Sequence, residues 1–79
     1  MEIKFSRHAK RRAKLYNISE EIIRGILEKK ELLEGNQEII KDVECFKYPL
    51  KIVVSVENDI VTVITNYPLK RGRKNESLL

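Results

Sequence analysis

A chain of 79 residues, 42% of them hydrophobic, is long enough for one domain with a thin core and too short for two. Its single cysteine, Cys45, excludes an internal disulfide, and no apolar stretch reaches the roughly 20 residues that span a bilayer. Residues 1–14 are polar and basic and lack the apolar stretch of a signal peptide. We therefore expect a cytoplasmic protein without a membrane segment.

The net charge of +4 is unevenly distributed along the sequence. Residues 1–14 carry six basic residues against one acid, and residues 68–79 carry four against one, whereas residues 15–67 carry six against ten. If the two basic ends meet in the fold, they form one cationic surface that attracts RNA phosphates or an acidic protein. The alternative is a solvated surface that only keeps the protein soluble.

The first predicted elements are a short extended lead-in at residues 1–5 and a helix over Arg7–Tyr16. Ser6 is suited to cap this helix, because its hydroxyl can accept a hydrogen bond from a backbone N–H one turn later. Three residues recur at helical spacing and are expected to be buried: Ala9, Ala13 and Tyr16. Asn17 is expected to end the helix.

A second helix is predicted from Ser19, as an antiparallel neighbour of the first. Glu20 and Glu21 fall in its first turn, where carboxylates interact favourably with the helix dipole. Its apolar face consists of four aliphatic residues: Ile22, Ile23, Ile26 and Leu27. Gly25 lies in the helix interior, where it costs about 1 kcal/mol relative to alanine, and it suggests a close approach of the first helix.

Three strands are predicted after the helices. A turn at residues 35–36 precedes a strand at Glu38–Phe46, and alternating apolar residues predict a second strand at Leu50–Glu57. The pair Asn58-Asp59 predicts a two-residue hairpin turn, because both residue types tolerate positive φ. The returning strand, Ile60–Tyr67, has apolar residues on both faces, so we expect it inside the sheet.

The expected fold class is α+β, with two N-terminal helices packed on a three- to four-stranded, mainly antiparallel sheet. Residues 1–69 are expected to form one domain, and residues 70–79 a basic C-terminal tail. One histidine and one cysteine do not make a metal cluster, so we expect neither a metal nor another cofactor.

His8 and Arg12 are the strongest candidates for chemistry. They are four residues apart, so their side chains share one face of the first helix. An imidazole beside a guanidinium suits phosphodiester chemistry, because the histidine can move a proton while the arginine holds the phosphate. The alternative is that both residues are structural, with Arg12 paired to an acid of the second helix.

Three segments resemble a family of small prokaryotic domains of unknown function: residues 5–13 (FSRHAKRRA), 16–21 (YNISEE) and 63–67 (VITNY). Members of that family open with F-[ST]-x-H-A-x-x-R and end with I-T-x-Y, and the similarity covers about residues 3 to 68. Asn17 stands where relatives often have glycine, and asparagine also tolerates the left-handed conformation. The family in turn resembles the RelE/ParE toxin superfamily.

The resemblance implies a RelE/ParE-like fold and a toxin-like RNA-binding domain, whose most specific form is a metal-independent endoribonuclease. It points to four catalytic candidates: His8, Arg12, Thr65 and Tyr67. We assign contacts with the RNA backbone to three basic residues: Arg11, Lys70 and Arg71. The expected partner is RNA, with or without the ribosome, or an acidic antitoxin-like protein. A non-catalytic protein-interaction module and a non-enzymatic nucleic-acid-binding domain remain the alternatives, and the oligomeric state stays open.

Overall fold

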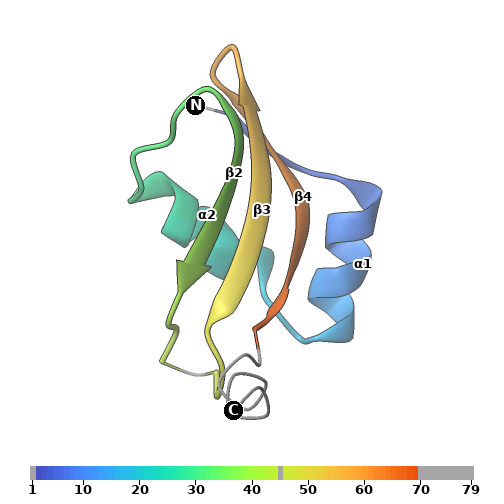
Figure 1. The fold of residues 1–79 in the computed structure, drawn as a ribbon. Coiled ribbons are helices and arrows are strands. Elements are labelled where there is room, and N and C mark those ends of the chain that lie inside the picture. Colours follow the sequence, from blue (N-terminus) through green and yellow to red (C-terminus); the bar gives the residue numbers. More distant parts are fainter. Residues whose placement is uncertain (1, 45, 70–79) are drawn as a thin grey trace, which may run out of the picture.

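The computed structural model describes residues 2–44 and 46–69 of the chain. In chain order the elements are β1 (Glu2–Phe5), α1 (Arg7–Leu15), α2 (Glu20–Glu28), β2 (Gly35–Lys41), β3 (Leu50–Glu57) and β4 (Ile60–Pro68). Figure 1 shows the strands as one twisted sheet with the helices at its back and side, which confirms the predicted α+β class. No helix in the described ranges is long and apolar enough to cross a membrane.

The four strands form one mixed sheet in the order β1-β4-β3-β2. The β2–β3 and β3–β4 pairings are antiparallel, as predicted, whereas β1 runs parallel to β4. The expectation of a mainly antiparallel sheet is corrected here, because residues 2–5 form a strand that pairs with residues 60–63. A short extended segment does not indicate from sequence which strand it will join.

The β3–β4 hairpin confirms both predictions made for it. Asn58 and Asp59 form the turn with φ values of 52° and 67°, and β4 lies between β1 and β3 inside the sheet. The hairpin also contains a bulge, because the register changes from Val54 opposite Val63 to Val53 opposite Thr65. Ile64 is therefore the extra residue on β4, and its side chain is exposed.

The strand predicted at residues 38–46 lies instead at residues 35–41. Its limits follow from its partner, because residues 35–41 pair with residues 50–56 and β3 begins at Leu50. Beyond residue 41 the chain turns, and the backbone N–H of Phe46 donates to the carbonyl of Val43 at 2.9 Å. Gly35, predicted to lie in a turn, is the first residue of β2 and has a φ of 104°.

The two helices begin at their predicted caps, Ser6 and Ser19, and the left-handed Asn17 (φ 57°) lies between them. They are not the side-by-side neighbours that the sequence suggested. Figure 1 shows α1 beside β4 and α2 behind β2 and β3. Accordingly, a Cβ atom built on Gly25 would meet no other atom within 4 Å, so no close helix approach explains this glycine.

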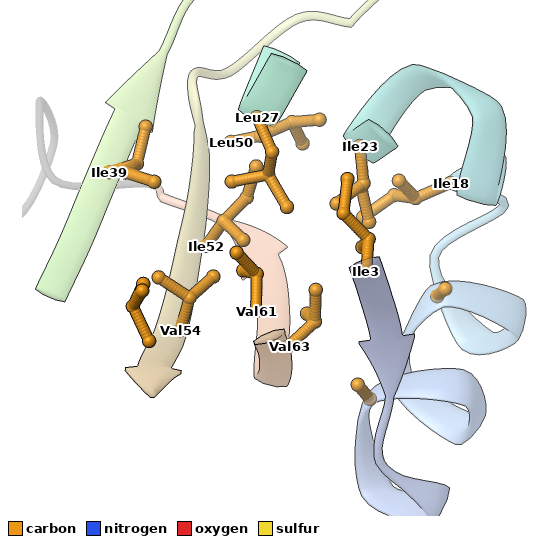
Figure 2. Close-up of a cluster of buried hydrophobic side chains, with 13 residues drawn as sticks. Ile3, Ile18, Ile23, Leu27, Ile39, Leu50, Ile52, Val54, Val61 and Val63 are labelled. Carbon is orange, nitrogen blue, oxygen red and sulfur yellow. The ribbon is translucent and has the colours of Figure 1, made fainter. Parts of the chain in front are cut away.

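The core lies between the helices and one face of the sheet. Figure 2 shows its side chains directed into the same space from β1, β3, β4 and α2. In α2 the fully buried residues are Ile23 and Leu27, whereas Ile22 and Ile26 are only half-buried. Burying one such side chain contributes about 1.5–3 kcal/mol, so Ile23 and Leu27 supply most of the stabilisation from this helix.

Candidate functional site

Ser6 fixes the start of α1 on β4. Its hydroxyl oxygen accepts a hydrogen bond from the backbone N–H of Ala9 at 3.0 Å and donates one to the carbonyl of Ile64 at 2.9 Å. Its own backbone N–H donates to the carbonyl of Val63 at 3.0 Å. The helix cap is therefore joined to the strand at the bulge.

Asn66 holds α1 one turn further along. Its side chain is fully buried, and its Nδ2 donates to the backbone carbonyl of Ala9 at 3.2 Å. Ala9 and Ala13 are both buried, and their small side chains let the helix backbone come close to the strand. In the VITNY segment Asn66 occupies the variable position of the I-T-x-Y motif, so no role was predicted for it. Its presence in a strand of mainly β-branched residues was the available signal, because asparagine is depleted in strands.

His8 and Arg12 lie on α1 four residues apart, His8 exposed and Arg12 half-buried. The guanidinium Nη1 of Arg12 donates to the hydroxyl of Tyr16 at 3.4 Å, one helical turn away. In the described part of the chain Arg12 forms no ion pair, so the alternative pairing with an acid of α2 is not found. Tyr16 therefore positions the guanidinium while leaving its charge uncompensated.

Thr65 and Tyr67 lie on β4 on the sheet face opposite the core. They stand opposite Val53 and Lys51 in the register, on either side of the inward-facing Asn66. Lys51 donates to the carboxylate of Glu38 with an Nζ–Oε1 distance of 3.2 Å. This hydrogen bond raises the pKa of Lys51 above its usual value, and the neighbouring Tyr67 adds to the shift.

The predicted catalytic residues thus form two pairs on different elements. His8 and Arg12 share a helix, and Thr65 and Tyr67 share a sheet face. Across residues 2–44 and 46–69, no hydrogen bond joins one pair to the other. Of the three residues assigned to RNA contacts, Arg11 is exposed on α1, whereas Lys70 and Arg71 lie outside the described residues, as does the rest of the predicted tail.

The exposed side of α1 is strongly basic. The helix contains no acid, and five of its residues are cations: Arg7, Lys10, Arg11, Arg12 and Lys14. None of the five forms an ion pair with another described residue. The solvent side of α1 therefore carries a concentration of unpaired positive charge, which we call the basic helix surface.

Fold and site together define a small α+β domain with a basic first helix fixed on the central strand of a mixed sheet. Residues 5–68 match the model of a family described as Domain of unknown function (DUF4258), and the chain belongs to this family. The match agrees with the predicted membership of a small family of unknown function. No curated protein and no solved structure matches the chain.

Proposed function

We propose that this protein is a toxin-like RNA-binding domain that contacts the phosphate backbone through its basic helix surface. The unpaired cations of α1 are the observation that carries the proposal. A protein that neutralises phosphates with lysine and arginine gains affinity from the counterions it releases. Five cations on nine residues would supply such contacts along one helix.

Helix stability accounts for only part of the charge on α1, because Arg12 and Lys14 lie in the last turn, where cations are favourable. Arg7 is the first residue of the helix, whose first turn contains no acid, and a cation at that end opposes the helix dipole. Cations placed three or four residues apart on one helix also repel each other. An anionic partner would relieve both effects, which favours a binding role over a merely solubilising one.

The more specific form of the proposal is cleavage of RNA without a metal. His8 would remove the proton from a ribose 2′-hydroxyl, whose oxygen then attacks the adjacent phosphorus. The bond between phosphorus and the 5′-oxygen breaks, that oxygen takes a proton from water, and a 2′,3′-cyclic phosphate remains. Arg12 would hold the phosphate and its developing charge, with Thr65 or Tyr67 as a further hydrogen-bond donor.

Binding is tested with the double variant Lys10→Glu/Arg11→Glu, which reverses two exposed charges on α1. We expect it to lose most of its affinity for a mixed RNA pool and to show a shallower dependence of affinity on salt. The matched control is Lys29→Glu/Lys30→Glu, which makes the same change in net charge at exposed residues after α2. Equal losses in the two variants would mean that overall charge, and not α1, drives RNA binding.

Catalysis is tested by incubating purified protein with mixed RNA, with and without ribosomes. We expect cyclic-phosphate ends, activity in EDTA, and a rate loss of roughly 10²–10⁴-fold in His8→Ala, the usual contribution of a general acid or base. Arg12→Lys is expected to be impaired as well, because an ammonium group cannot grip phosphate with two parallel hydrogen bonds. A folded protein that binds RNA and cleaves none in either condition would leave a non-enzymatic binding domain.

An acidic antitoxin-like protein is the second partner that the basic helix surface would attract. The salt dependence of binding distinguishes RNA from a protein partner, because the affinity for phosphates falls log-linearly with salt across many RNA sequences. A protein partner would instead depend on the shape of one complementary surface.

A further inference from the structure

Residues of α2, of the segment after it and of the end of β2 line a groove of about 360 Å³. In Figure 1, β2 lies at the edge of the sheet away from α1. Four isoleucines contribute the apolar lining of the groove: Ile22, Ile26, Ile39 and Ile40. Ile39 belongs to the core, and Ile22 and Ile26 are half-buried. Ile40 stands opposite Lys51 in the register, so its 45% exposed side chain is directed to the other face of the sheet. The apolar face of α2 is thus wider than the core requires, and its remaining part opens into this groove.

The strand beside the groove has a free edge. β2 is the last strand in the sheet order, so alternate residues turn their backbone N–H and C=O groups away from β3. Near the start of the strand, the side chain of Gln37 forms hydrogen bonds with the backbone N–H and carbonyl of Leu33. Residues 39–41 line the groove, so an incoming strand would find hydrogen-bonding backbone and apolar side chains together.

The residues that line the groove carry a net positive charge, which favours an acidic partner. Three lysines line the groove, Lys29, Lys30 and Lys41, against the single acid Glu21, and none of the three is ion-paired within the described ranges. Residues 70–79 of the same chain carry four basic residues and one acid, so they are repelled. A second copy of the chain would bring the same lysines to the contact.

We propose that this groove binds an extended acidic segment of a partner protein. The segment adds to β2 as an edge strand, and its alternate apolar side chains enter the space between Ile22, Ile26 and Ile39. Its carboxylates face Lys29, Lys30 and Lys41. The site is separate from the basic helix surface and does not depend on RNA binding.

A substitution at Gly25 provides the sharpest test of peptide binding in the groove. Gly25 lines the groove, and a Cβ atom added to it has no neighbour within 4 Å. We therefore expect Gly25→Leu to preserve the fold, to improve helix propensity and to fill the groove. The matched control is Glu28→Leu, which adds the same side chain at an exposed α2 residue outside the groove.

The probe is a displayed library of random peptides long enough to form a strand, selected on the full wild-type chain. We expect the selected peptides to alternate apolar and acidic residues. The best of them should bind Gly25→Leu at least about tenfold more weakly than wild type, and should bind Glu28→Leu no more weakly than wild type. Lys29→Glu/Lys30→Glu should weaken peptide binding and leave RNA binding unchanged. Lys10→Glu/Arg11→Glu should weaken RNA binding and leave peptide binding unchanged.

Several outcomes would overturn the proposal. They are selection of basic or patternless peptides, and peptide binding that Gly25→Leu leaves unchanged. A wild-type dimer that Gly25→Leu dissociates would assign the groove to a second copy. NMR shifts of residues 70–79 on introducing Gly25→Leu would assign it to the basic end of the same chain.

Discussion

The two helices have nine residues each, yet they are attached to the sheet by different means. α1 buries only the alanines Ala9 and Ala13, and hydrogen bonds from Ser6 and Asn66 hold it on β4. α2 buries Ile23 and Leu27, whose burial supplies far more hydrophobic stabilisation. Hydrogen bonds with defined geometry fix the position of α1, whereas apolar area in α2 stabilises the whole domain.

The sides that the two helices leave exposed differ in the same way. α1 presents unpaired cations on a backbone held firmly against the strand, and α2 presents spare isoleucines beside a free sheet edge. In this domain α1 positions a charged surface, whereas α2 stabilises the fold. Substitutions in the two helices should therefore have separable effects.

The largest effect on the free energy of unfolding is expected from substitutions on the buried side of α2. Leu27→Ala should lower the free energy of unfolding by about 2–5 kcal/mol, because it leaves a cavity at a fully buried position. That is a large share of the stability of a small domain. Urea denaturation measures the change. Ile26→Ala, at the groove, should cost clearly less, and equal losses would mean that the buried side of α2 is misassigned.

A smaller effect with a distinct pattern is expected at Asn66. Asn66→Ala removes the buried hydrogen bond to the carbonyl of Ala9 but also a buried Oδ1 that has no partner, so its net cost should be at most about 1 kcal/mol. Amide exchange should accelerate in α1 while β3 stays protected. The control is Asn36→Ala, an exposed position on β2 that should change neither quantity. Uniformly faster exchange in Asn66→Ala would show that Asn66 does not hold α1 specifically.

Replacing Gly25 or Gly35 by alanine should change the stability of the protein in opposite directions. Gly25→Ala should stabilise the protein by up to about 1 kcal/mol, because the added methyl group meets nothing and alanine favours helix. Gly35→Ala, with φ at 104°, should destabilise it, since an L side chain is strained there. Thermal unfolding of both variants checks the pair, and a destabilised Gly25→Ala would contradict the open space beside α2.

The smallest effect concerns Lys51 and Glu38 on the open sheet face. Because the folded pKa of Lys51 is raised above 10.5, the pair stabilises the protein below that pH. The contribution is lost as pH rises through the folded pKa. Glu38→Gln should therefore be slightly less stable than wild type near neutral pH, and the difference should vanish in strong alkali and shrink at high salt. A difference that grows with pH would exclude this pairing.

The sequence predicted the elements that carry local signals. The serine caps, the helical spacing of Ala9 and Ala13, and the Asn58-Asp59 turn each fix a nearby backbone conformation, and all were found where expected. The limits of β2 were missed, because they depend on the register between β2 and β3, although β3 itself was predicted correctly. The parallel partner of β1 was missed for the same reason, since pairing is decided by distant residues.

The same distinction between local signals and pairing with distant residues applies to the candidate site. Helical spacing alone places His8 and Arg12 on a common face. The relation of Thr65 and Tyr67 to the helix depends on the bulge at Ile64, which shifts the register and directs Asn66 inward. Whether the four residues act together stays a prediction. The groove was hidden from the sequence because Ile22 and Ile26 have the same pattern as the buried Ile23 and Leu27.

The parallel pairing of β1 with β4 has a consequence for how the chain folds. Residues 2–5 meet residues 60–63, so the first strand to be synthesised must wait for the last. Because contacts between distant residues close large loops, the antiparallel β2–β3–β4 meander can assemble before β1 docks. Ser6 and α1 also bind β4, so the basic helix would stay undocked on the emerging chain until β4 has left the ribosome. Correct placement of the cationic surface would then be among the last events of folding.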